Sequence, residues 1–222
     1  MITLCEEDIL EIRKPNVWDL GNHILYDMCT TYPKHCCDEE IIAKIWLIGR
    51  SYAASIERRK VAKKGSDKFY ETEVAPALRN IMIDEWLDSI SDTDDPGSAR
   101  TVEMHKKLLD IFESITDLGK RSLASKYLHF HKPKAFFIYD SRARRTIPMF
   151  VPRINELPEM TVEIYDQEYR DFVRRCIWLR EMIKKTFQTE CTPREIDKLL
   201  LMYASRPEKL YPIPSTSGSP SH

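Results

Sequence analysis

A single carboxylate, Asp140, lies in the most basic segment of this chain. Between Lys120 and Arg145 there are eight lysine or arginine residues and no other acidic residue. Asp140 directly follows the apolar run AFFIY, so burial of that run would carry the carboxylate to the edge of the core, beside the arginines that come next. Burial raises the pKa of a carboxyl group and neighbouring positive charge lowers it, and the sequence leaves the direction of the net shift open.

The residues around Asp140 fit two kinds of chemistry. An aspartate in this place can cap the turn or helix that follows the apolar run and pair with Arg142 or Arg144. A cluster of cations can instead bind the phosphates of a nucleic acid, although such a cluster is often no more than a solvated face. The chain has a net charge of −1, so any attraction to a polyanion has to come from a local cluster of this kind.

Histidine and cysteine residues are present, but their spacing does not match a metal site. His129 and His131 are two positions apart on a predicted helix and therefore point in different directions. His35, Cys36 and Cys37 have no second pair of ligands at zinc-like spacing. The six cysteines are too sparse for a disulfide framework, and we expect reduced thiols and no metal or other cofactor.

The elements that carry these residues are predicted to be helices, because apolar residues recur mainly at helical spacing. We expect an all-α fold in which residues 1–211 form one helical domain, as one body or as two lobes around a shared core. Residues 212–222 are rich in proline, serine and glycine and are expected to form a disordered tail. The expected helices cover residues 5–13, 17–31, a stretch that begins at 38, one or two segments around 76, and residues 100–115, 121–131, 163–187 and 193–204.

Several predicted helices carry start signals. Asn16 and Asp38 are candidate caps for the second and third helices. Thr192 and Glu195 have the spacing of a capping box, with Pro193 at the first helical position, so the last helix is expected to begin there. The run AFFIY is short and apolar and is predicted to be extended, like a buried strand.

The sequence argues against a membrane protein. No apolar run approaches the roughly 18 residues that a membrane-spanning helix needs. The stretch MITLCEEDILEIRKP has acidic residues where a signal peptide is basic. We expect an intracellular monomer, cytoplasmic or nuclear, with no membrane among its partners.

The helix RSLASKYLHFH leads through KAFFIY to Asp140, which lies 18 positions after Ser122 and is followed by SRARR. This arrangement resembles the helix-hairpin-helix DNA glycosylase superfamily, an all-helical fold in which a helix and a short apolar stretch lead to an aspartate that serves the chemistry. The similarity is closest to the adenine-glycosylase branch, in which serine occupies the position of a catalytic lysine. A second stretch, DEEIIAKIWLIGRSYAAS, looks like the family's early apolar helix and the polar loop that enters the DNA. Together these stretches cover roughly a fifth of the chain.

The hairpin of this chain departs from the family pattern. The family has a Leu-Pro-Gly-Val-Gly type sequence whose backbone amides hold a phosphate, whereas this chain reads ITDLGKRS. Gly119 is therefore the only glycine of the hairpin. Lys120 and Arg121 would have to bind phosphate as point charges.

Two further departures concern the DNA-entering loop and a cofactor. The early helix ends in Gly49, Arg50 and Ser51, where the family has a glutamine that fills the gap left by a flipped base. Only Cys176 and Cys191 remain beyond the basic segment, so the iron–sulfur cluster that is common in the adenine branch is not expected.

The resemblance implies a role for each site residue. Asp140 would be the catalytic carboxylate that stabilises positive charge at the anomeric carbon or orients the attacking water. With Ser122 where a nucleophilic lysine would stand, the reaction would be hydrolysis without a Schiff base or strand cleavage. Lys126, one helical turn on and on the same side, is a rival nucleophile. The residues expected to bind nucleic acid are Gly119, Lys120, Arg121, Arg142, Arg144, Arg145, Arg50 and Ser51, and the candidates for stacking on a flipped base are Tyr52, Tyr127, Phe130 and Tyr139.

We therefore expect a monofunctional DNA glycosylase-like protein that hydrolyses the N-glycosidic bond of a modified or mismatched base, with DNA as partner and RNA or a nucleoside as the other options. The alternative is a non-catalytic helical module that binds nucleic acid or regulates, in which Asp140 orders the basic loop. A helical interaction protein unrelated to DNA is a third hypothesis. The spacing of Ser122 and Asp140 favours the enzyme, and the degenerate hairpin favours the non-catalytic module.

Overall fold

The computed structural model describes residues 1–58, 68–91 and 96–205. These residues form helices joined by turns and extended segments, and no strand occurs among them, so the all-α prediction is confirmed. The predicted loop at 65–67 and the predicted tail at 212–222 lie outside the described residues. The helices are α1 (Glu6–Arg13), α2 (Asp19–Thr31), α3 (Asp38–Ser51), α4 (Ala75–Arg79), α5 (Ile83–Asp88), α6 (Ala99–Thr116), α7 (Arg121–His131), α8 (Ser141–Thr146), α9 (Gln167–Phe187) and α10 (Pro193–Ala204), with short helical turns η1 (Tyr70–Val74), η2 (Ile147–Met149) and η3 (Ile154–Glu156).

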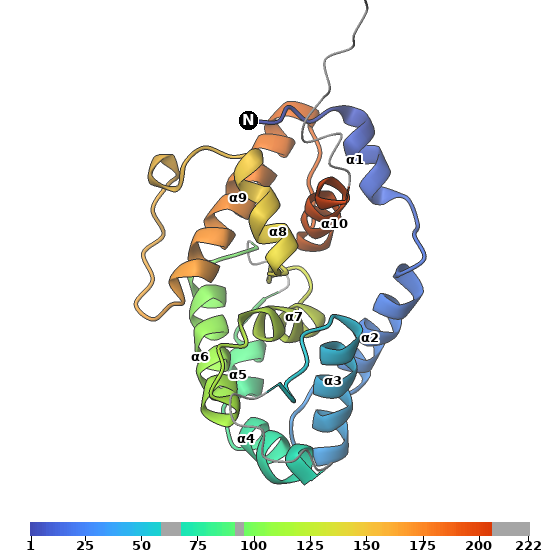
Figure 1. Ribbon diagram of the computed structural model, residues 1–222, viewed down its shortest axis with the longest axis vertical. Coiled ribbons are helices and arrows are strands. Elements are labelled where there is room, and N and C mark those ends of the chain that lie inside the picture. The colour runs from blue at the N-terminus through green and yellow to red at the C-terminus, as the bar shows by residue number, and fades with distance from the viewer. Residues whose placement is uncertain (59–67, 92–95, 206–222) are drawn as a thin grey trace, which may run out of the picture.

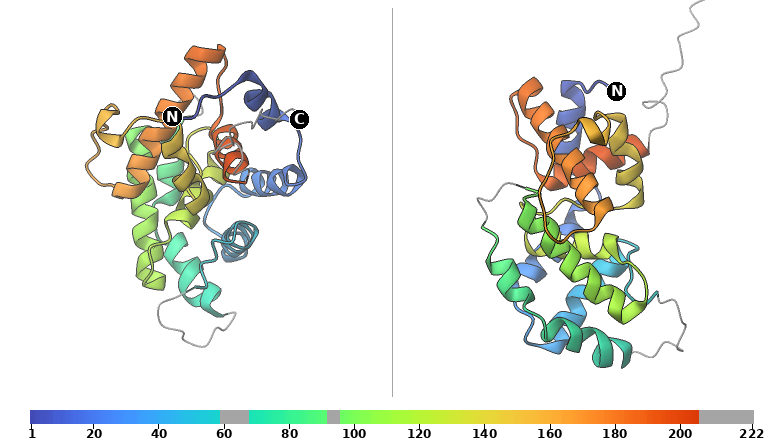
Figure 2. Two further views of the ribbon diagram at one scale, coloured as in Figure 1. Left: turned by 45° about the horizontal axis from the view of Figure 1, so that its top comes forward. Right: turned by 90° about the vertical axis from the view of Figure 1, so that its left-hand side faces the viewer.

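The helices form two lobes, each packed around its own hydrophobic cluster (Figure 1). The lower lobe contains α2 to α7, and the upper lobe contains α1, α8, α9 and α10. The chain therefore starts in the upper lobe, builds the lower lobe and then returns (Figure 2). Helix α6 serves both clusters, because Val102 near its start belongs to the upper one whereas Leu108 and Phe112 belong to the lower one.

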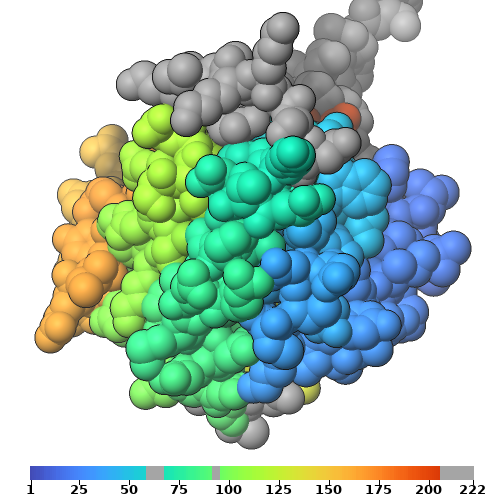
Figure 3. Space-filling view, turned by 90° about the horizontal axis from the view of Figure 1, so that it is seen from below, coloured from blue at the N-terminus to red at the C-terminus, as the bar shows by residue number. Residues whose placement is uncertain are grey.

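The helices α3 to α6 close the lower lobe from below. Seen from that side, α3 and the segment from η1 to α5 lie next to each other, with α6 on the other flank (Figure 3). Their inward faces bury Ile45, Leu78 and Leu108 completely. Burial of each such side chain contributes about 1.5–3 kcal/mol to the hydrophobic driving force, so this packing is a main source of the lower lobe's stability.

A connecting segment, residues 135–139, links the two clusters. Phe136 enters the lower cluster, whereas Phe137 and Tyr139 enter the upper one. The run AFFIY is predicted to be extended like a buried strand, but Ala135 ends a turn and residues 136–139 belong to no helix or strand. Its backbone is instead fixed to α7, where the buried Ser125 hydroxyl accepts the Tyr139 amide at 3.0 Å.

Close packing against this segment requires glycine at position 97. Gly97 has a φ of +77°, and its amide donates to the Ala135 carbonyl at 2.9 Å. A Cβ atom there would lie 2.7 Å from Val173 and 2.9 Å from Phe137. A residue with a Cβ atom at this position would push the chain before α6 away from Val173 and Phe137.

Helices α6 and α7 form a hairpin through the stretch ITDLGKRS, residues 115–122, where the sequence predicts one. Helix α6 ends at Thr116, and Asp117 adopts the left-handed conformation with a φ of 56°. Residues 117–120 then lead into α7, whose buried face includes Leu123 and Tyr127. The predicted helix over 121–131 and its core-facing side are therefore confirmed.

The predicted helix starts are confirmed in one case and wrong in three. Thr192 caps α10 and forms the expected capping box with Glu195. Asp38 is the first residue of α3 rather than its cap, because its carboxylate pairs with Arg79. Asn16 does not cap α2, whose N-cap is Trp18. Helix α9 begins at Gln167 instead of residue 163, because the Asp166 side chain accepts the Tyr169 amide at 2.8 Å.

None of the helices within the described parts of the chain combines the length and the apolar composition that are needed to cross a bilayer.

The two lobes bury four histidines whose pKa values fall below the ordinary value of 6.5, chiefly because burial disfavours the charged ring. The pKa of His35, His105 and His129 is lowered to about 4, and that of His131 is lowered well below 6.5. These rings remain neutral in the folded protein at a pH where the unfolded chain binds protons. Their contribution to stability is thus complete above pH 6.5 and is lost as the pH falls toward 4.

We predict that the free energy of unfolding decreases between pH 6.5 and pH 5, by up to about 1.4 kcal/mol per pH unit for each histidine. Urea denaturation at a series of pH values measures the slope. The variant His129→Gln should have a shallower slope than the wild type, and His23→Gln, which removes an exposed histidine, is the matched control. A stability that does not change over this range would contradict the neutral state of the buried rings.

Candidate active site

Asp140 directly follows the segment that joins the two hydrophobic clusters and is the N-cap of α8. Its Oδ1 accepts hydrogen bonds from the backbone amides of Arg142 and Ala143, both at 2.8 Å. Among the described residues, Oδ2 accepts no hydrogen bond and forms no ion pair with Arg142 or Arg144. The predicted cap is therefore present and the predicted pairing with arginine is not. One oxygen of a half-buried carboxylate remains available.

Lys126 and Ser122 lie on the α7 face next to Asp140. The Lys126 ammonium donates to the Ser122 hydroxyl oxygen at 2.8 Å, and the lysine is only 3% exposed. Burial lowers the pKa of Lys126, and the negative charges of Asp140 and Asp197 oppose that effect. Lys126 and Ser122 are thus in direct contact, and the charge of Asp140 acts on the same buried ammonium group.

Asp197 completes this charged cluster and was not predicted from the sequence. It lies on α10, is 2% exposed, and pairs through Oδ2 with Arg194 at 2.5 Å. Burial and the neighbouring charge of Asp140 raise its pKa to about 6, against the lowering effect of Arg194 and Lys126. The sequence contained one signal for Asp197. It lies three positions before Leu200, on the buried side of the predicted helix, where acidic residues are rare.

Of the four stacking candidates, only Tyr52 borders the charged cluster on a partly open surface. Its ring centroid lies 5.3 Å from the Lys126 ammonium, and its hydroxyl donates to Asn22 Oδ1 at 2.6 Å. Tyr127 and Phe130 are fully buried in the lower cluster, so they cannot stack on a bound base. Tyr139 is buried in the upper cluster and its hydroxyl donates to Glu168 at 2.6 Å. The stacking role expected for these three residues is therefore incompatible with their positions.

Two of the predicted phosphate-binding residues in the hairpin are engaged within the protein. The Lys120 ammonium donates to the carbonyl oxygens of Ser55 and Arg58 at 3.0 and 2.5 Å. Burial and the charge of Arg58 lower the pKa of Lys120 to about 8. Arg121 forms a bidentate pair with Asp166 at 2.5 and 2.8 Å. Neither side chain is a free point charge.

The arginines after Asp140 differ in their surroundings. Arg144 pairs with Glu168, which also pairs with Arg121 at 2.9 Å. Arg142 donates to the hydroxyl of Ser205. Arg145 is exposed and forms no ion pair with any described residue. The basic segment therefore carries less uncompensated charge than its sequence suggests.

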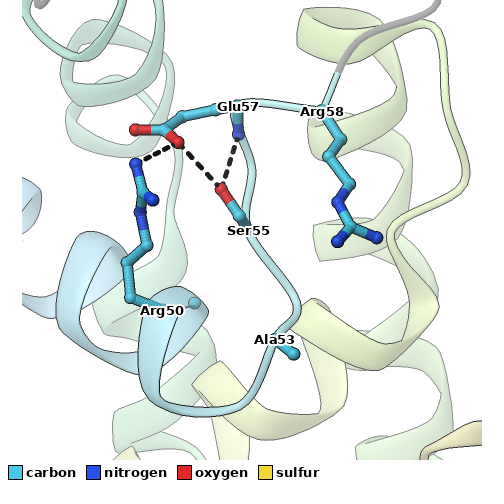
Figure 4. Close-up of a pocket in the computed structure, with 6 residues that line it drawn as sticks. Arg50, Ala53, Ser55, Glu57 and Arg58 are labelled. Carbon is cyan, nitrogen blue, oxygen red and sulfur yellow. Dashed lines mark hydrogen bonds and ion pairs between the residues drawn. The ribbon is translucent and has the colours of Figure 1, made fainter.

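The loop after α3 lies between Arg50 and the start of α7 (Figure 4). Glu57 binds Arg50 and Ser55 on one side of the loop, while the Arg58 side chain points to the other side (Figure 4). Ala53 has a φ of 50°, a conformation that costs free energy for a residue with a Cβ atom and that clusters at functional sites.

Two surface hollows share this loop. One, of about 350 Å³, lies over Arg50, Ala53 and Glu57. The other, of about 150 Å³, lies over Ala53, Gly119 and Ser122. Gly119 has open space on its Cβ side. The hairpin, the loop and Ser122 thus form one continuous surface beside the charged cluster, whereas Ser51 at the end of α3 is exposed outside both hollows.

The ring nitrogens of His129 and His35 form hydrogen bonds with other groups of the protein. His129 lies between the Tyr26 hydroxyl and the Phe136 carbonyl oxygen, at 2.7 and 2.8 Å. His35 lies between Asp84 and the Tyr127 hydroxyl, both at 2.7 Å. No cluster of three or more potential metal ligands occurs within residues 1–58, 68–91 and 96–205.

Comparisons with models of known protein families, with curated protein sequences and with solved structures find no match for this chain. The function has to follow from the geometry of the site itself.

The charged cluster makes a testable prediction about Asp197. Replacing Lys126 with Met removes a positive charge that lowers the Asp197 pKa, so that pKa should rise above 6. Replacing Asp140 with Asn removes a negative charge and should lower it. The carboxyl carbon chemical shift of Asp197 in a pH titration measures both effects, with Lys134→Met as the exposed control. Equal Asp197 pKa values in all variants would show that the three groups are not neighbours.

Proposed function

We propose that this chain is a monofunctional DNA glycosylase-like hydrolase with a helix-hairpin-helix glycosylase-like fold, and that Asp140 is its catalytic carboxylate. The observation that carries the proposal is the free oxygen of Asp140. The carboxylate is held by two backbone amides through Oδ1, Oδ2 accepts no hydrogen bond from the described residues, and the Asp140 charge raises the pKa of Lys126, whose ammonium donates to Ser122.

This geometry suits cleavage of an N-glycosidic bond. As the base leaves, positive charge develops at the anomeric carbon of the sugar, and a fixed carboxylate oxygen stabilises that charge or orients the attacking water. The amide contacts hold Asp140 in one position, so little reorganisation is needed in the transition state. Ser122 accepts a hydrogen bond from Lys126, which leaves its own hydroxyl hydrogen free to bind a substrate oxygen.

The non-catalytic module remains the alternative, and a specific observation favours it. Capping of α8 is a sufficient structural reason for Asp140, and acidic partners already occupy Arg121 and Arg144. A protein that only binds nucleic acid needs nothing more from Asp140. In the proposed enzyme, Oδ2 of Asp140 acts on the substrate. In the non-catalytic module, Oδ2 has no role.

The variant Asp140→Asn separates the two functions, because asparagine caps helices about as well as aspartate. Under the proposed function it should decrease the single-turnover excision rate by on the order of 10³-fold or more while stability is unchanged. The assay uses enzyme in excess over duplex and single-stranded oligonucleotides with modified or mismatched bases. An excision rate equal to that of the wild type would show that Asp140 only caps the helix.

Arginine variants test the contact with DNA. Arg145→Ala should weaken binding to any duplex and reduce the slope of log K against log salt by about 1, because it removes one free cation. Arg144→Ala is the matched comparison and should have a smaller effect, because Arg144 is paired with Glu168. Fluorescence anisotropy at several salt concentrations measures both slopes. Identical slopes in the wild type and Arg145→Ala would place the DNA elsewhere.

Borohydride trapping tests whether Lys126 is a nucleophile. Lys126 is 3% exposed and its ammonium donates a hydrogen bond to Ser122, so we expect no covalent adduct with an abasic product. An adduct that forms with the wild type and is lost in Lys126→Gln would show that Lys126 attacks the sugar and forms a Schiff base, which would contradict this expectation.

A further inference from the structure

Two buried polar atoms close to the charged cluster have no hydrogen-bond partner among the described residues. They are Oδ1 of Asp197 and Nδ2 of Asn22. Asp197 is 2% exposed and Asn22 is 8% exposed. Burial of a polar atom without a partner costs free energy, and such atoms in a folded protein call for an explanation, for example a bound ligand.

Both residues lie where α10 meets α2. The Tyr52 hydroxyl donates to Asn22 Oδ1, so the unpartnered amide nitrogen of Asn22 is on the other branch of the same side chain. Asp197 directly precedes Lys198, the residue through which α10 contacts α2, and Asn22 lies one turn after Asp19 on that helix. Asn22 comes from α2 of the lower lobe and Asp197 from α10 of the upper lobe.

The two helices are joined by an ion pair at this boundary. Lys198 on α10 lies 3.1 Å from the Asp19 carboxylate at the start of α2. Asp140, Ser122 and Tyr52 border the same region and are partly accessible to solvent. The two unpartnered atoms are buried, whereas these three residues are partly exposed.

We propose that Asp197 Oδ1 and Asn22 Nδ2 bind the hydrogen-bonding edge of a neutral nucleobase, which rests on the proposed function and assigns the base-binding part of its site. The Asp197 oxygen accepts an N–H of the base, and the Asn22 amide donates to a neighbouring oxygen or nitrogen. The edge of a purine or pyrimidine carries a donor next to an acceptor. The Asp197 oxygen and the Asn22 amide are the complementary acceptor and donor.

The surrounding charges restrict the class of base. Asp197 already pairs with Arg194, and the Lys126 ammonium is close by, so two positive groups balance the acids. The site is therefore close to neutral, and a base with a permanent positive charge, as N-alkylation of a nucleoside produces, gains no net electrostatic attraction there. A base whose N–H is replaced by N–CH₃ would leave Asp197 Oδ1 without a partner.

Binding of free bases tests the inference without any catalytic step. Saturation-transfer NMR and calorimetry would compare hypoxanthine with 1-methylhypoxanthine, uracil with 3-methyluracil, and adenine with N6,N6-dimethyladenine. The wild-type protein should bind at least one unblocked base at least tenfold more tightly than its methylated counterpart. This comparison uses only the wild-type protein and does not depend on whether a variant folds.

Two isosteric variants then assign the binding to these atoms. Asp197→Asn keeps an oxygen for Arg194 and replaces the free acceptor with a donor. Asn22→Asp keeps the oxygen that accepts from Tyr52 and replaces the free donor with an acceptor. Each should weaken binding of the unblocked base at least tenfold, whereas the exposed control Lys134→Met should bind it like the wild type.

The inference is overturned if no unblocked base binds at millimolar concentration, if blocked and unblocked bases bind equally, or if both isosteric variants fold and bind like the wild type. Failure of the proposed function looks different. In that case the unblocked base still binds and is lost in the two variants, but the wild-type protein excises no base from any oligonucleotide.

Discussion

The site depends on the connecting segment 135–139, which is anchored in two hydrophobic clusters at once. Phe136 is fixed in the lower lobe and Phe137 in the upper lobe, so consecutive residues determine how the lobes meet. The Ser125 hydroxyl holds the Tyr139 backbone against α7. Because Asp140 is the next residue and Ser122 and Lys126 lie on α7, this anchoring fixes the carboxylate relative to both.

A buried, charged cluster at a lobe boundary is expensive in free energy. Lys126 and Asp197 are almost completely buried, and removing each from water is compensated only in part by its neighbours. A core packed with apolar residues at these positions would serve stability as well or better. The arrangement is consistent with a site in which fixed charges act on a substrate, where perturbed pKa values concentrate.

Local chemistry made part of this structure predictable. The capping box of Thr192 and Glu195 and the apolar face of α7 depend on residues three or four positions apart, so both follow from the sequence. The pairing of Arg121 with Asp166, and of Asp38 with Arg79, joins residues 45 and 41 positions apart and requires the folded geometry. The same holds for Asp197, whose role appears only when α10 is placed against the lobe boundary.

The most direct test of the account is a double-mutant cycle between Asp140 and Lys126 on the single-turnover excision rate. If the two residues act as one unit, the effects of Asp140→Asn and Lys126→Gln will be strongly non-additive, and the double variant will be little slower than Asp140→Asn alone. Additive effects of the two substitutions would mean that the buried ammonium and the carboxylate do not work together, and the proposed active site would be wrong.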